Sequence, residues 1–241
     1  CRAPSGKDAG LAFRVDFNFA SGEMPRVGDT NDGMPGSLNF SLAGSANYCS
    51  ELNCNNKNVI LTPLESYAWG SFLIPAPNYM DLEALRFFRA TFSLQRTAQS
   101  LGDGFSFNFM PPIPVVVGAA GVRDGLSLVF ADAPGTKLIV YFEAVVIHQV
   151  QVTNWFSVDG RAVLTVGFSS SGLLVHHSVH GRIVSGVAIR GWQPQADWVV
   201  AIGASSGRKI AQYEISRLEA AFGAHVTARA APLRVALNGQ Q

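Results

Sequence analysis

The feature that most constrains the fold is a strict alternation of aromatic and polar residues near the middle of the chain. Phe105, Phe107 and Phe109 occupy every second position, with Ser106 and Asn108 between them. Because successive side chains of a β-strand point to opposite faces of its sheet, this order puts the three rings on one face and the polar groups on the other. The pattern predicts a β-strand whose aromatic face packs into a core.

Similar short runs recur along the chain at the spacing of a β-sandwich, without the alternating helices of a parallel sheet. The predicted strands are Phe13–Phe19, Asn58–Leu61, Ser71–Ile74, Phe88–Leu94, Gly104–Phe109, Leu126–Phe130, Leu138–Ile147, Trp155–Val158, Arg161–Val166, Leu173–Val179, Val184–Ile189, Trp198–Ile202 and Tyr213–Phe222. A turn is predicted at 132–135, and a two-residue hairpin turn is predicted at Asp159-Gly160 between the strands on either side, because Pro and Gly supply the dihedrals of a chain reversal. Residues Ala211–Phe222 also have apolar residues at helical spacing, but we interpret them as a bulged strand.

Composition bounds the size of the fold and excludes some partners. The 241 residues fit one large β-sandwich or two small domains, and Lys plus Arg number 18 against 17 Asp plus Glu, for a formal charge of +1. This balance supplies no electrostatic attraction for phosphate backbones, so nucleic acid is not expected as a partner. The longest apolar stretches, 115–122 and 138–147, fall short of the roughly 20 residues that a membrane-spanning helix needs. No membrane span is expected in this fragment.

Cysteine spacing and one sequon indicate an extracellular or cell-surface protein. Cys49 and Cys54 lie close together in an Asn-rich loop, where they would form a small disulfide and leave Cys1 unpaired within this chain. An odd cysteine at the first residue suggests a partner upstream in a longer chain, or a free thiol. The triplet Asn39-Phe40-Ser41 is an N-glycosylation sequon and points the same way.

The C-terminal residues differ from the rest of the chain. Residues 223–231 are Ala-rich and unpatterned, and Pro232–Gly239 again has strand-like composition. We expect residues 1–222 to form one domain and residues 223–241 to form a linker or the start of a following β-domain. Neighbouring domains or subunits of an extracellular assembly are then expected partners.

Two parts of the sequence carry a family resemblance. Gly102–Pro111 opens with Gly-Asp-Gly and alternates aromatics before a Gly/Ala loop, Gly118–Gly121, and the strand Gly125–Phe130. Trp198–Gly207 leads to Tyr213–Phe222, in the order of a late strand, a variable loop and a closing strand. Both resemble the L-type (legume) lectins and the wider concanavalin A-like and laminin G-like superfamily. The resemblance implies an all-β, two-sheet antiparallel jelly-roll sandwich that binds carbohydrate at its edge loops.

The resemblance also implies which residues would bind a sugar. Asp103 sits where the family places a carboxylate that accepts hydrogen bonds from two sugar hydroxyls, a role for an acceptor-only group. Ala120 and Gly121 fall in the loop whose backbone N–H groups donate to the sugar. The variable loop that shapes specificity corresponds to Ser205, Ser206 and Gly207.

One departure from the family concerns the metal site. The family binds its Mn/Ca pair with a Glu and an Asp two residues apart on one strand, and the corresponding positions here are Val129 and Ala131. Asp132 comes one position late and would point to the opposite face of a regular strand. We therefore expect no metal ligands and no cofactor.

Two patterns raise catalysis as an alternative. Residues Gly203–Gly207 match the Gly-x-Ser-x-Gly nucleophile elbow, but only Glu214, Glu219 and His225 follow as acid or base, without the further sheet that a hydrolase needs. Asp81-Leu-Glu83 puts two carboxylates on one strand face, as glycoside hydrolysis uses. We interpret both acids as rim residues and predict that the chain is not an enzyme.

Histidines and aromatics leave further alternatives open. A strand would place His176 and His180 on one face and His177 on the other, where two imidazoles could join a zinc site or simply face solvent. Six aromatic residues could stack on sugar rings or belong to the core: Tyr67, Trp69, Tyr79, Trp155, Trp192 and Trp198.

The sequence as a whole predicts a non-catalytic extracellular recognition module that binds a glycan or glycoprotein. The alternative is a purely structural or protein–protein interaction module of an extracellular assembly, and a glycoside hydrolase is the third possibility.

Overall fold

The computed structural model describes residues 11–16, 27–29, 41–48, 58–75, 87–98, 102–113, 116–132, 135–194 and 198–223. Every regular element in these ranges is a β-strand, and every strand pair is antiparallel. No helix that is long and apolar enough to cross a membrane occurs in the same ranges. The predicted all-β class is confirmed.

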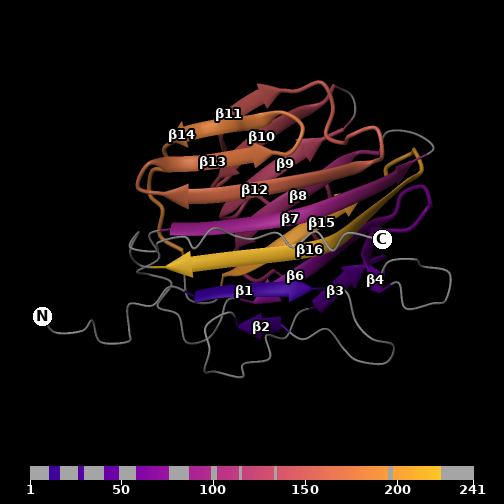
Figure 1. Cartoon of the computed structure of the whole chain (residues 1–241), viewed down its shortest axis with the longest axis horizontal. Coiled ribbons are helices and arrows are strands. Elements are labelled where there is room, and N and C mark those ends of the chain that lie inside the picture. The colour runs from indigo at the N-terminus through magenta and orange to yellow at the C-terminus, as the bar shows by residue number, and fades with distance from the viewer. Residues whose placement is uncertain are drawn as a thin grey trace, which may run out of the picture.

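The described strands form two sheets that lie one over the other (Figure 1). The nine-stranded sheet has the order β14 (Gly181–Val187), β13 (Gly172–His177), β12 (Arg161–Ser169), β7 (Phe87–Ala98), β16 (Ala211–Gly223), β1 (Leu11–Asp16) and β2 (Val27–Asp29), with β5 (Val59–Thr62) paired to β16 and β4 (Asn47–Tyr48) paired to β5. The seven-stranded sheet has the order β11 (Val145–Gln151), β10 (Lys137–Phe142), β9 (Leu126–Ala131), β8 (Gly104–Met110), β15 (Val199–Ser205), β6 (Trp69–Pro75) and β3 (Ser41–Gly44).

The space between the sheets is filled by aromatic side chains, including the three that the alternation predicted. Phe105, Phe107 and Phe109 of β8 are fully buried. The Phe107 ring stacks on Phe92 of β7 in the opposite sheet, with ring centroids 5.7 Å apart. Offset ring pairs of this kind add to the free energy gained by burying apolar area. The two-sheet sandwich with a shared phenylalanine-rich core is therefore confirmed.

The predicted strand Leu138–Ile147 is wrong in one respect, because it is two strands. Strands β10 and β11 are joined by a tight turn in which Glu143 and Ala144 both have positive φ, 49° and 64°. A two-residue hairpin needs this conformation, which is usually supplied by Asn or Gly, so the apolar run hid the turn. The turn is held by its amides, which donate to the carbonyls of Gly125 (3.0 Å) and Arg123 (2.6 Å).

The predicted strand 155–158 is also wrong. This segment is irregular, because its first residue turns into the core: Trp155 is fully buried and its Nε1–H donates to the carbonyl of Ala131 at 2.7 Å. The turn predicted before β12 is present, with Gly160 at φ 76° and its N–H bonded to the carbonyl of Ser157 at 2.9 Å. It leads into β12 without forming a hairpin.

The ambiguous segment Ala211–Phe222 is a strand. It belongs to β16, which pairs with β7 through a register shift between Ile215 and Arg217, so the bulged-strand interpretation is confirmed. Several predictions lie outside the described residues: those on Cys1, Asn39, Cys49, Cys54, Tyr79, Asp81, Glu83 and 224–241.

Candidate functional site

Asp103 lies in the turn that leads into β8, at one end of the sandwich. Its backbone is held from two sides, because its N–H donates to the carbonyl of Ser205 (3.2 Å) and its carbonyl accepts from the N–H of Asp132 (3.0 Å). Its side chain is exposed. The fold therefore presents a carboxylate to solvent from a fixed backbone.

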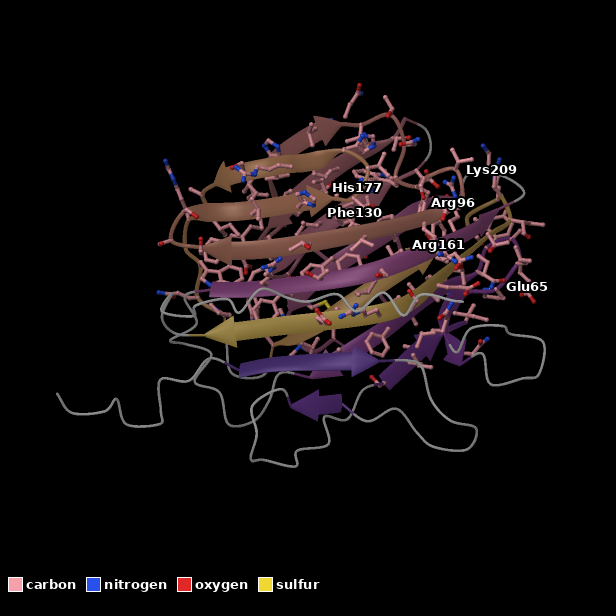
Figure 2. All side chains as sticks on the ribbon, viewed as in Figure 1. Glu65, Arg96, Phe130, Arg161, His177 and Lys209 are labelled. Atoms are coloured by element: carbon pink, nitrogen blue, oxygen red, sulfur yellow. The ribbon has the colours of Figure 1, made fainter. Side chains whose placement is uncertain are left out.

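Three polar side chains, those of Asp132, Tyr213 and Arg96, interact with one another next to this turn. The Asp132 carboxylate accepts hydrogen bonds from the Tyr213 hydroxyl (3.1 Å) and from the Arg96 guanidinium, which also lies over the Phe156 ring. Burial, and then the neighbouring Asp132 charge, raise the pKa of Tyr213 far above its ordinary value. Asp132 is thus buried, and its carboxylate is used by Tyr213 and Arg96. Figure 2 shows Arg96 at the same end of the sandwich as Glu65 and Lys209.

The end of β15 lies directly against the Asp103 side chain. Ser205 Oγ donates to Asp103 Oδ2 at 3.1 Å. Gly207 has φ +59°, and a Cβ at this position would lie 2.1 Å from Asp103 Oδ1. Only glycine combines this left-handed backbone with so close an approach to the carboxylate.

Ser206 plays a different part from its neighbours. It is fully buried, and its hydroxyl donates to the Glu65 carbonyl (2.7 Å) and accepts from the Ala68 N–H (3.0 Å). The Tyr67 N–H donates to the Gly207 carbonyl at 2.5 Å, and the Ser206 N–H donates to the Ala68 carbonyl at 2.9 Å. These bonds fix the connection between β5 and β6 to the loop that contacts Asp103.

A second loop reaches the site across the outer face of the seven-stranded sheet, the face that points away from the nine-stranded sheet. Asn108 of β8 is its main anchor: Oδ1 accepts from the Val122 N–H (3.2 Å) and from Ser127 Oγ (2.7 Å), and Nδ2 donates to Ser106 Oγ (2.9 Å). Ser106 Oγ in turn donates to the Gly118 carbonyl at 2.7 Å. Ser106 and Asn108 on the outer face of β8 are therefore buried, and both bond to this loop.

The loop passes beside Ser205 at its glycine-rich turn. A Cβ on Gly118 would lie 3.9 Å from the Ser205 Cβ. The Gly121 N–H closes the turn onto the Gly118 carbonyl at 3.1 Å, and Ala120 is exposed at the tip. Gly121 has φ +64°, and a Cβ there would lie 2.1 Å from Ser127 Oγ, so the turn depends on glycine. The structure thus brings Ser205 and Gly207 against Asp103 and places Gly118 beside Ser205, while Gly121 lies against Asn108 and Ser127 on the sheet.

Known structures share this architecture. Winged bean acidic lectin complexed with methyl-α-D-galactose matches with a TM-score of 0.64 and 17% identity, over 89% of this chain and 99% of that one. The lectin from Bauhinia forficata in complex with GalNAc matches with a TM-score of 0.64 and 15% identity, over 90% and 100%. The VIP36 exoplasmic/lumenal domain, in its metal-free form, matches with a TM-score of 0.58 and 17% identity, over 79% and 86%. The chain has the L-type lectin fold.

No protein-family model and no curated protein matches the sequence. The lectin fold was nevertheless predictable, because the glycine turns and the alternating strand around Asp103 lie where the resemblance placed them.

The lectin fold raises the question of a metal, since VIP36 is also known in a Ca²⁺- and mannose-bound form. Calcium prefers several carboxylate and carbonyl oxygens. Here Val129 and Ala131 are apolar, Asp132 is taken by Arg96 and Tyr213, and Asn108 is used in holding the loop. No three His, Cys, Asp or Glu side chains come together among the described residues. The residues present do not fit the metal pair of legume lectins.

The nucleophile-elbow pattern is not in the context that catalysis requires. Its central residue, Ser205, ends β15 and donates to the Asp103 carboxylate. The next element is the strand β16, whereas the elbow places its serine between a strand and a helix. Here Ser205 and Gly207 of the pattern pack against the Asp103 side chain.

The histidine prediction is wrong in its geometry. Strand β13 ends at His177, so His180 lies in a turn with its ring stacked on His177 and not beside His176, which is exposed. His177 Nδ1 accepts from two backbone N–H groups and its Nε2 lies 2.6 Å from the Trp155 carbonyl. Burial lowers the pKa of His177 and favours the neutral ring, as in a core histidine.

The structure also sorts the aromatic residues that the sequence left open. Trp155 and Trp198 are buried and Trp192 packs against the core, while Tyr67 and Trp69 are exposed. The sequence could not separate the buried aromatics from the exposed ones. At the start of β6, for example, too few residues alternate to show which face each side chain occupies.

Proposed function

We propose that this chain is a non-catalytic carbohydrate-binding module whose site is centred on Asp103. The observation that carries the proposal is an exposed carboxylate on a backbone fixed by Ser205 and Asp132. A carboxylate only accepts hydrogen bonds and has about four acceptor positions, so after the Ser205 hydroxyl it still has capacity for two sugar hydroxyls. Such charge-assisted hydrogen bonds are strong ones, and fixing the group beforehand lowers the entropy cost of binding.

The neighbours in fold support a glycan as the ligand. The winged bean and Bauhinia structures hold methyl-α-D-galactose and GalNAc, and a VIP36 structure holds mannose. A glycan or glycoprotein on the extracellular or lumenal side of a membrane is the expected partner. The VIP36 fragment is an exoplasmic/lumenal domain, which supports that location.

The way in which the loop around Gly118 is held supports sugar binding that does not depend on a metal. In this chain Asn108 and Ser106 connect the loop around Gly118 to the sheet through hydrogen bonds, and Ser127 of β9 donates to Asn108. Because these bonds supply the anchorage directly, sugar affinity is expected to be the same with a chelator as with added calcium. A chelator that abolishes binding would contradict this part of the proposal.

The proposal is tested by titrating the folded protein with methyl α-D-galactoside, N-acetylgalactosamine and methyl α-D-mannoside, after screening on a glycan array. Asp103→Asn keeps the shape but replaces an acceptor by a donor, so we expect at least a tenfold loss of affinity. Gly207→Ala should lower affinity similarly, because its methyl group would displace the Asp103 carboxylate.

The matched control is Val145→Ala, an exposed substitution on β11 at the far edge of the same sheet. A folded wild-type protein that binds no glycan would overturn the proposal and favour a purely structural module. Sugar binding that Asp103→Asn leaves unchanged would place the site elsewhere.

A further inference from the structure

The irregular connection between β11 and β12, residues 152–160, is held near its centre by two histidine rings. The Trp155 carbonyl lies 2.6 Å from His177 Nε2, and the Asn154 carbonyl lies 2.5 Å from His180 Nε2. In the part of the chain that the structure describes, no backbone group bonds to the backbone of residues 153–156. The two imidazoles therefore supply the polar contacts that fix this stretch of backbone.

The hydrogen bonds of His177, at the end of β13 (Figure 2), require its ring to be neutral. The N–H groups of Val179 and His180 both donate to His177 Nδ1, at 3.1 and 3.3 Å. An imidazole nitrogen that accepts carries no proton, so the single ring hydrogen is on Nε2, which donates to the Trp155 carbonyl. A proton on Nδ1 would face two N–H donors in a fully buried site, and the arrangement does not permit it.

His180 tolerates a proton where His177 does not. Its half-buried ring stacks on His177 with the ring centroids 5.0 Å apart. Nε2 of His180 can donate to the Asn154 carbonyl whether or not Nδ1 carries a second hydrogen. A charge on His180 also repels a charge on His177, so His177 is the acid-sensitive member of the pair.

The groups packed around His177 do not compensate a charge on its ring. Its partners across the sheet are Leu164 of β12 and Gly181 of β14, and residues 153–156 are uncharged. The charged or titratable side chains of β12, β13, β14 and the connecting segments are half-buried His180 and exposed Asp159, Arg161, His176 and Arg182. Burial lowers the pKa of His177 most, the bond to the Trp155 carbonyl raises it, and charges on His180 and His176 lower it further.

We propose that His177 and His180 form an acid-sensitive latch on the connection between β11 and β12, closed while His177 is neutral and released when its ring takes up a proton. The latch acts on Trp155, whose indole meets Phe130 edge-on with ring centroids 5.1 Å apart and donates to the Ala131 carbonyl at 2.7 Å. Release would loosen the connection around this indole while the two sheets stay paired. The inference goes beyond the proposed function and does not depend on it.

The direction of the pH effect follows from these bonds. In the unfolded chain His177 takes up its proton as the pH falls through the ordinary histidine value of 6.5, whereas the closed latch excludes that proton. Because the folded pKa is the lower one, the contribution of the latch to stability is complete above pH 6.5 and is lost as the pH falls below it.

Amide hydrogen exchange on the intact chain, at about pH 7.5 and about pH 5, tests the latch. After correction for the intrinsic pH dependence, the Val179 and His180 amides should exchange about tenfold faster at the lower pH. The amides of Phe107 and Leu128, which lie in the core, should keep their protection. Equal acceleration at all four amides would show global acid unfolding and overturn the latch, as would unchanged exchange at Val179 and His180.

His177→Gln separates titration of the ring from its role in packing. Glutamine offers an acceptor and a donor but does not titrate in this range, so exchange at the Val179 amide should become independent of pH after the same correction. His176→Gln, an exposed substitution on the same strand, is the matched control and should behave as wild type. A pH effect that persists in His177→Gln, or one that disappears in His176→Gln, would contradict the latch.

The nitrogen NMR signals of the His177 ring give a test on wild type that does not require any variant to fold. At about pH 7.5 they should show a neutral ring with its hydrogen on Nε2, and protonation of the ring should follow the same pH curve as exchange at Val179. A ring hydrogen on Nδ1 at neutral pH, or protonation that leaves the Val179 amide protected, would overturn the proposal.

Discussion

The two faces of strand β8 are both buried, but different parts of the chain cover them, and the two kinds of burial have different effects. On the inner face Phe105, Phe107 and Phe109 pack against the opposite sheet. On the outer face Ser106 and Asn108 are covered by the loop that borders the candidate site, and their polar atoms bond to it.

The two faces of β8 contribute to the structure in different ways. Burial of large apolar groups supplies most of the free energy that favours folding. A buried polar group gains much less, but it is costly to leave unpaired, so it specifies one position for the loop that pairs with it. The inner face thus stabilises the sandwich, and the outer face positions the loop at its end.

The strongest test of the division removes a ring from the inner face. Phe107→Ala should lower the free energy of unfolding by about 3–5 kcal/mol, because it leaves a cavity between the sheets. Urea denaturation measures this loss. Sugar affinity of the folded fraction should stay within a few-fold of wild type, and an equal loss of affinity would show that the two faces are not separable.

Removing the Asn108 side chain from the outer face is expected to lower stability less than Phe107→Ala does, and to affect the loop more. Asn108→Ala should cost about 2–3 kcal/mol, since it leaves the Val122 N–H and the Ser127 hydroxyl without their acceptor. Amide hydrogen exchange should show faster exchange at Val122 while the core amides keep their relative protection.

Ser127→Ala is the matched control, because it removes a single donor and keeps Asn108 bonded to Val122. It should cost about 1 kcal/mol and leave the Val122 amide protected. Loss of stability in Asn108→Ala without faster exchange at Val122 would contradict the anchoring role.

The smallest effect at neutral pH is expected at Tyr213 of β16, which packs against the inner face of β8. Its ring packs near Phe105 in the core, and its hydroxyl reaches Asp132 below the Asp103 turn. Tyr213→Phe should cost about 1 kcal/mol at pH 7. Because burial raises the pKa of Tyr213, the folded state keeps its proton above pH 10 while the unfolded state loses it.

The contribution of Tyr213 is thus complete below about pH 10 and is lost as the pH rises further. Urea unfolding of wild type between pH 9 and 11 should show stability falling more steeply than in Tyr213→Phe. Parallel curves for the two proteins would contradict the assignment.

The inner face of β8 could be predicted from the sequence, and the burial of its outer face could not. Alternation is a local property, so the residues around the three phenylalanines suffice to predict that they share one face of the strand. Ser106 and Asn108 are polar, and what covers them is a loop that lies ten or more residues further along the chain. A local pattern contains no information about such a cover.

The candidate site divides in the same way. The resemblance placed Asp103 and the segment 205–207 near each other, and the structure brings them into contact. Trp69 was one of six aromatic candidates in the sequence, but the sequence could not show that it is exposed or that it pairs with Ser205, 136 residues later. The hairpin turn at Glu143 and Ala144 was missed because neither residue is one that usually takes positive φ.

The hydrogen bonds that join the connection before β6 to the end of β15 have a consequence for redesign of the molecule. Ser206 and Gly207 are bonded to Glu65, Tyr67 and Ala68, so the two segments hold their shapes jointly. A graft that exchanges residues 205–209 for those of another protein would remove the hydrogen bonds that hold residues 65–68 in place. Engineering of new ligand preferences must therefore transplant both segments as a single unit.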